Sequence, residues 1–239
     1  MKTKFLLLMF VQTLFVGCND DSDNGNKTPE PIAINDTFNT SMQGWECDFA
    51  DYPTEKGDSV FYELEWKHAS LPEPLDKTKK AIMISGNNHS DDLFMFLRKN
   101  ITGLIPGQTY EVAFEVELAS DAASNLMGVG GAPGESVSIG VGCTATKPQK
   151  IEEQGYYRMN IKKINQMNDG EDMKLIGNIA NGTEESKFVL IQRSGSVKAK
   201  ADDKGEAWVI VGTDSGFEAT TTLYYTNIKI NFTPVEPDL

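Results

Sequence analysis

A short loop at residues 86–92 holds the densest group of hydrogen-bonding side chains in this chain. Its sequence is Gly-Asn-Asn-His-Ser-Asp-Asp. Amides, an imidazole and carboxylates can each make directional hydrogen bonds to the hydroxyl groups of a ligand. Aromatic rings beside polar segments can stack on its flat faces, although Trp also fills cores and Asn also forms turns. The candidate ligand-binding residues are Asn87, Asn88, His89, Asp91, Trp45 and Tyr52.

Three glutamates form a second group that could do chemistry. Glu111, Glu115 and Glu117 alternate with apolar residues, so a β-strand would place all three on one face. A pair of carboxylates is what a glycoside hydrolase uses to cleave a glycosidic bond. The same carboxylates could instead contact a bound ligand, or form the solvated face of a half-buried strand.

Other catalytic patterns are absent or incomplete. His68 and His89 are the only histidines, and the chain contains no His-Glu-x-x-His and no Cys-x-x-Cys, which argues against a zinc site. Asp214-Ser-Gly216 resembles an aspartic protease motif, but the second copy that such an enzyme needs is missing. This segment therefore predicts a turn.

The charge of the chain excludes one class of partner. Its formal net charge is −13, and removal of Lys2 and Lys4 with an N-terminal leader would give 20 − 35 = −15. The Lys and Arg residues form no run that could overcome repulsion from a phosphate backbone. We therefore expect no nucleic-acid partner.

The elements that must position these residues are β-strands. Thr109 to Ala119 alternates strictly, with Tyr110, Val112, Phe114, Val116 and Leu118 on one face. No segment has a sustained apolar stripe of period 3.6, so we expect few and short helices. Many short strands separated by Gly, Asn, Asp and Ser predict a sandwich or barrel. Further strands are expected at Ala81–Ser85, Leu93–Lys99, Ser136–Val141, Tyr156–Ile161, Met173–Ile176, Lys187–Gln192, Ala207–Val211 and Thr222–Asn231.

The N-terminus predicts export and a lipid anchor. Residues 1–17 combine two early lysines with an apolar run that is too short to span a bilayer. The segment ending Phe15-Val16-Gly17-Cys18 resembles the processing site of bacterial lipoproteins, which implies acylation of Cys18 and membrane contact through that lipid alone. The alternative is an ordinary secretory signal peptide.

Residues 18–31 predict an acidic flexible tether, because they contain no large apolar residue. Asp20, Asp21 and Asp23 resemble a signal that moves some lipoproteins to the outer face of the outer membrane. We therefore expect an outer-membrane protein displayed at the cell surface, with a periplasmic orientation as the alternative. Residues 32–239 would then form one domain.

Cys47 and Cys143 are the other two cysteines. Outside the cytoplasm they could form a disulfide, or remain two separate buried thiols. The sequence favours neither.

Three segments together resemble the jelly-roll carbohydrate-binding modules of the galactose-binding-like superfamily, particularly families 4, 9 and 22. They are the opening segment Asp36–Trp45, the turn and strand Ile101–Phe114, and the closing strand Leu223–Ile230. Residues 120–200 match no family. A fibronectin type III strand can show the same Leu-x-Pro-Gly turn, but one such domain is about half the available length.

The resemblance implies an all-β jelly-roll sandwich that captures glycan without cleaving it. Some members hold a structural calcium between the first and last strands, which makes Asp36 and Asn227 candidate ligands, although Asn227 replaces the usual aspartate. Two other functions stay open. One is a protein-interaction or structural subunit of an outer-membrane complex, and the other is a glycoside hydrolase that uses Glu111, Glu115 and Glu117.

Overall fold

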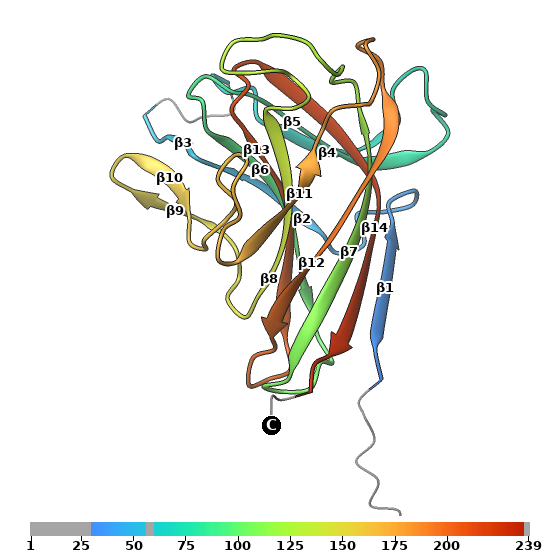
Figure 1. Ribbon diagram of the computed structural model, residues 1–239, viewed down its shortest axis with the longest axis vertical. Coiled ribbons are helices and arrows are strands. Elements are labelled where there is room, and N and C mark those ends of the chain that lie inside the picture. The colour runs from blue at the N-terminus through green and yellow to red at the C-terminus, as the bar shows by residue number, and fades with distance from the viewer. Residues whose placement is uncertain (1–29, 56–59, 237–239) are drawn as a thin grey trace, which may run out of the picture.

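The computed structural model describes residues 30–55 and 60–236, and every regular element in these two ranges is a β-strand (Figure 1). The expected short helices are absent from the described ranges. No helix there is long and apolar enough to cross a membrane. The predicted leader, Cys18 and the tether up to residue 29 lie outside the described residues.

The first sheet has the strand order β12-β7-β14-β5-β4, and β1 joins it by pairing with β14. All neighbouring strands are antiparallel. The strands are β1 (Ile32–Thr37), β4 (Glu65–Ser70), β5 (Lys80–Asn87), β7 (Thr109–Ser120), β12 (Val189–Lys200) and β14 (Thr220–Pro234).

The second sheet has the order β11-β8-β13-β6-β2 and is also antiparallel. Its strands are β2 (Glu46–Ala50), β6 (Leu93–Ile101), β8 (Val137–Thr144), β11 (Met173–Asn178) and β13 (Ala207–Ser215). A small third sheet contains β3 (Tyr52–Pro53), β10 (Tyr156–Met159) and β9 (Lys150–Glu153).

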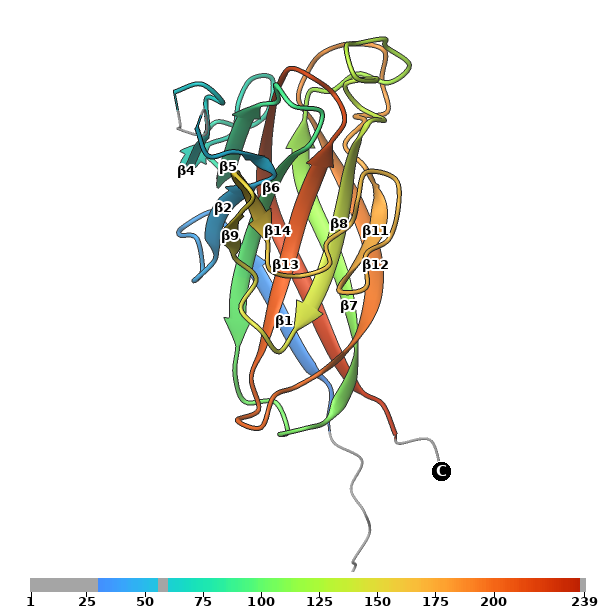
Figure 2. The same cartoon turned by 90° about the vertical axis from the view of Figure 1, so that its left-hand side faces the viewer.

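Consecutive strands alternate between the two large sheets. The chain passes from β5 in the first sheet to β6 in the second, then back to β7 and across to β8. The same alternation recurs from β11 to β14, and Figure 2 shows the two resulting layers. Antiparallel strands that cross repeatedly between two sheets form a jelly-roll β-sandwich. The predicted fold class is therefore confirmed.

The main core lies between the sheets and follows from the two-residue periodicity. The five apolar residues predicted to share a face of β7 are all buried in it, together with Val209 and Val211 of β13. A second core covers the outer face of the second sheet, where Phe94 and Phe96 pack with Ile161 and Ile164 of the connection between β10 and β11. This covering explains why β6 is apolar on both faces.

The two cysteines are separate buried thiols, so the disulfide alternative is wrong. Cys47 lies on β2 and Cys143 on β8, and β6 and β13 lie between these strands. Three strand spacings of about 4.8 Å separate the Cα atoms by about 14 Å, whereas a disulfide needs them within about 7 Å. Burial raises the pKa of each thiol to about 12.

Candidate functional site

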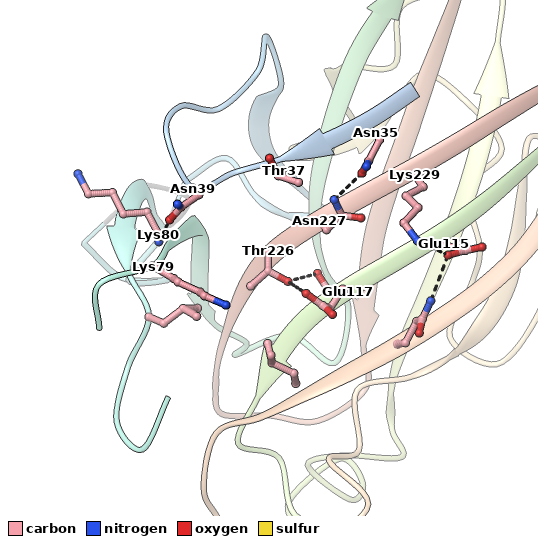
Figure 3. A pocket seen from close by; sticks show the side chains of 13 residues that line it. Asn35, Thr37, Asn39, Lys79, Lys80, Glu115, Glu117, Thr226, Asn227 and Lys229 are labelled. Carbon is pink, nitrogen blue, oxygen red and sulfur yellow. Dashed lines mark hydrogen bonds and ion pairs between the residues drawn. The ribbon is translucent and has the colours of Figure 1, made fainter. Parts of the chain in front are cut away.

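A polar groove of about 540 Å³ lies on the outer face of the first sheet (Figure 3). Its floor comes from β1, β7, β12 and β14, and one rim comes from the connection between β4 and β5. Its volume is within the usual range for small-molecule sites. The lining residues are Asn35, Thr37, Asn39, Leu71, Lys79, Lys80, Glu115, Glu117, Leu190, Gln192, Thr226, Asn227 and Lys229.

The groove lies where β14 changes its pairing partner. The first part of β14 pairs with β5 as far as Tyr225, and the second part pairs with β1 from Asn227 onward. Thr226 falls between the two partners, at a break in the register with β7. β5 and β1 follow one another end to end along the same edge of β14. The sheet therefore has a local gap between them, and the polar ends of both strands surround it.

The two carboxylates in the groove are held by neighbouring side chains. Glu115 Oε2 accepts hydrogen bonds from Lys229 Nζ at 3.0 Å and from Gln192 Nε2 at 3.3 Å. Glu117 Oε1 accepts a hydrogen bond from the Thr226 hydroxyl group at 2.6 Å. Figure 3 shows both side chains lying over the same face.

The amides of the groove are also oriented by hydrogen bonds. Asn227 Nδ2 donates to Asn35 Oδ1 at 2.7 Å. The backbone N–H of Lys80 donates to Asn39 Oδ1 at 3.0 Å. These contacts use the oxygens of Asn35 and Asn39, and no hydrogen bond within the described ranges uses their Nδ2 groups.

The predicted glutamate face is partly in this groove. Glu115 and Glu117 line it, as the alternation along β7 predicts. Glu111 lies away from it, beside a smaller groove with Lys174 and Lys198, and it accepts a hydrogen bond from Ser196. The sequence reasoning missed the partners on other strands. Their signal was the alternation of polar residues at positions 35, 37 and 39, and at positions 227 and 229.

The loop predicted to bind ligand lies at the other end of β5, seven residues or about 23 Å from Lys80. His89 and Asp91 are exposed and Asn87 is half-buried. Asn88 is buried, and its Nδ2 donates to the carbonyl oxygens of Ser215 and Phe217. Asn88 thus fastens this loop to the turn after β13.

Aromatic rings collect beside His89. Its imidazole lies 4.6 Å from the Phe61 ring and 5.5 Å from the Tyr62 ring, measured between centroids. Tyr62 in turn packs against Tyr52, which packs against Tyr157. The structure therefore connects Tyr52 to the His89 loop, although Tyr52 itself is only 3% exposed and supports the surface from beneath.

Trp45 is part of the main core, and its hydrogen bond and ring contact are with Asp36 and Phe38 and not with this loop. It is 3% exposed, its ring packs edge-on against Phe38, and its Nε1–H donates to Asp36 Oδ2 at 2.8 Å. Lys99 Nζ lies 2.6 Å from the same carboxylate oxygen. Trp45 therefore has a structural role.

The calcium ligand pair predicted at Asp36 and Asn227 is wrong. Asp36 pairs with Ile228 across β1 and β14, and both side chains are buried. Asn227, one residue earlier, faces the outer groove, so the two side chains lie on opposite faces of the sheet. Lys99 already neutralises Asp36. Among the described residues, no group of three or more His, Cys, Asp or Glu side chains could hold a metal ion.

A partly buried charge cluster was also missed by sequence reasoning. Lys163 Nζ lies 2.9 Å from Asp51 Oδ2 and 2.5 Å from Asp214 Oδ2. Arg158 Nη1 lies 3.1 Å from both Asp51 Oδ1 and Asp92 Oδ2. Burial and the nearby Asp51 raise the pKa of Asp92 to about 6. The cluster fastens β10 and the following connection to the ends of β2, β6 and β13.

No protein-family model matches this sequence, and no curated protein matches it. One solved structure with a similar fold is a carbohydrate-binding module from the β-sandwich superfamily, at 10% identity and a TM-score of 0.37. That match covers 82% of this chain and 58% of the other, so this chain spans less than two thirds of its length.

Two further solved structures resemble the chain in the same general way. A carbohydrate-binding module that recognises mannan has 8% identity and a TM-score of 0.37, with 85% of this chain and 99% of the other covered. A cyclase from Fischerella sp. TAU has 9% identity and a TM-score of 0.42, with 86% and 100% covered. Since such distant likenesses span binding modules and an enzyme, function has to be derived from the residues of this chain.

Proposed function

We propose that this protein is a surface lipoprotein whose β-sandwich captures a saccharide without cleaving it, and that the groove on the first sheet is its binding site. The observation that carries this proposal is the lining of the groove. Eleven of its thirteen lining side chains are polar or charged, and nine of these eleven stand on strands of the first sheet. Rigidly placed amides, hydroxyls and charged groups suit a ligand covered with hydroxyl groups.

Binding fits the groove better than catalysis does. A general acid in a glycoside hydrolase needs surroundings that keep a proton on its carboxyl group. Glu115 is instead half exposed and paired with Lys229, and Glu117 accepts a hydroxyl hydrogen bond. Both carboxylates act here as fixed hydrogen-bond acceptors.

Affinity electrophoresis against a panel of polysaccharides tests the proposal. We expect at least one polysaccharide to retard the protein, and we expect Asn227→Ala to weaken this retardation. Asn231→Ala is the matched control, because Asn231 is an exposed asparagine of the same strand outside the groove. Retardation by none of the polysaccharides would overturn the proposal. Hydrolysis that Glu115→Gln abolishes would favour the glycoside hydrolase.

The loop at the other end of β5 is a second predicted contact surface for the same function. His89 and Phe61 expose ring surface there, and stacking on a sugar face needs such a surface. If this loop rather than the groove binds the saccharide, His89→Ala will reduce retardation and Asn227→Ala will not.

The anchor and location belong to the same proposal and rest on residues 1–31 of the sequence. We expect metabolic labelling with palmitate to modify the wild-type protein and not Cys18→Ser. We also expect externally added protease to reach the domain on intact cells. Protection from that protease until the outer membrane is broken would favour the periplasmic orientation. Co-purification of an outer-membrane protein without any saccharide binding would favour the interaction-subunit alternative.

A further inference from the structure

The groove is positively charged although the chain is strongly acidic. The whole sequence has a formal net charge of −13. The groove contains Lys79, Lys80 and Lys229 against Glu115 and Glu117, which gives a local balance of 3 − 2 = +1. A site that reverses the sign of its surroundings favours a ligand of the opposite charge.

Among the described residues, one of the three lysines, Lys79, presents an unpaired amine to the groove, and a second, Lys80, lies unpaired at its rim. Lys229 is paired with Glu115. Lys79 and Lys80 are exposed, and neither forms an ion pair within the ranges that the structure describes. Asp76, in the turn that precedes them, is held by Thr78 instead. Figure 3 shows the Lys79 side chain extending toward Thr226 and Glu117, whereas the Lys80 amine points away from them at the rim.

The hydrogen-bonding groups that remain unused in the groove include several donors. The carboxylate of Glu115 already receives two donors and that of Glu117 receives one. Asn35 and Asn39 have their oxygens occupied, which leaves their Nδ2 groups for a ligand. The ammonium group of Lys79 extends into the same groove, and that of Lys80 lies at its rim.

From this charge and these unused donors, and on the basis of the proposed saccharide function, we propose that the groove binds an anionic saccharide. The anionic group of the sugar, a carboxylate or a sulfate ester, would lie beside the Lys79 ammonium group, which extends into the groove, while Lys80 at the rim would add to the attraction. Charged acceptors form shorter and stronger hydrogen bonds with such donors than hydroxyl groups do. The sugar hydroxyls would meet Asn227, Gln192 and Glu117 on the floor.

The test compares matched polysaccharides by affinity electrophoresis with the full chain. The probes are polygalacturonate against its methyl ester, which removes the carboxylate charge, and chondroitin sulfate against its desulfated form. We expect a charged member to retard the protein, its matched form with that group removed to bind at least tenfold more weakly, and added NaCl to reduce the retardation. The arm that responds identifies the anionic group.

Variants locate the effect in the groove. We expect the double variant Lys79→Gln and Lys80→Gln to bind the charged polysaccharide about tenfold more weakly, since each exposed ion pair contributes modestly. Lys204→Gln is the control, because Lys204 is exposed, forms no ion pair within the described ranges and lies in the turn between β12 and β13.

Two results would overturn the inference and leave the proposed function standing. One is equal binding of each charged polysaccharide and its form without that anionic group, and the other is full binding by the double variant. If no saccharide of either kind retards the wild-type protein, the proposed function fails together with this inference.

Discussion

The ionisation of Asp92 is coupled to the stability of the fold. Its carboxylate lies in the cluster with Asp51, Lys163 and Arg158, where burial and the charge of Asp51 raise its pKa to about 6. An unfolded Asp has a pKa of about 3.9. Between about pH 4 and pH 6 the native state therefore holds a proton that the unfolded state has lost, so this group lowers stability as the pH rises through that window.

Asp92→Asn removes that dependence and predicts a specific pH profile. The free energy of unfolding of the variant, relative to the wild type, should increase from pH 4 to pH 7. We expect a change of about 1 kcal/mol, because the side chain is 37% exposed and solvent screens the charges. Urea denaturation of both proteins at several pH values measures it. A difference between the two proteins that stays constant with pH would contradict the raised pKa of Asp92.

Residues of the site were predictable from the sequence only where the pattern within a single strand indicated their position. Glu115 and Glu117 were found because alternation within β7 places them on one face. Their partners Lys229 and Thr226 lie on β14, and strand pairing is not visible in one sequence. Asn88 was found as a loop residue, but its buried position depends on carbonyl groups more than 120 residues away.

Close packing on the outer face of the second sheet requires a glycine where a buried phenylalanine lies over it. Gly212 on β13 lies between Phe96 on β6 and Gly140 on β8. A Cβ at Gly212 would lie 2.4 Å from Phe94 Cζ and 2.9 Å from its Cε2. Phe94 is fully buried and belongs to the second core, so it has little room to move.

Gly212→Ala should therefore destabilise the protein by about 1–3 kcal/mol through overpacking. Gly216→Ala is the matched control, because the nearest atom to its added Cβ would be at 3.4 Å, an ordinary contact distance. Thermal or urea denaturation distinguishes the two variants. Equal stability of Gly212→Ala and the wild type would mean that Phe94 is free to shift.

Nine of the fourteen strands in the described residues overlap a segment that the sequence predicts as a strand, and the five that it missed are β1, β2, β3, β4 and β9. The strands expected at Thr109–Ala119 and Leu93–Lys99 correspond to β7 and β6. The expected strand Lys187–Gln192 covers only the start of β12, which continues to Lys200 through Arg-Ser-Gly-Ser. That polar stretch stays a strand because all twelve residues of β12 pair with β7. Pairing with β7 stabilises a strand that the local residue propensities do not predict.

At the scale of the whole molecule, the sandwich is held by one continuous core and not by a covalent link between its strands. The main core contains residues from both large sheets, including Cys47 and Cys143 themselves. Each thiol behaves as a small apolar side chain in a site that disfavours the reactive thiolate. Stability should therefore not depend on the redox state of the solution.

Alkylation of the full chain without reductant, followed by peptide mapping, tests this. We expect neither Cys47 nor Cys143 to react in the native protein, and both to react fully once urea unfolds it. The midpoint of urea unfolding should be the same with and without a reducing agent. Labelling that requires prior reduction of the unfolded chain would reveal a disulfide, and would mean that β2 and β8 are not separated by β6 and β13.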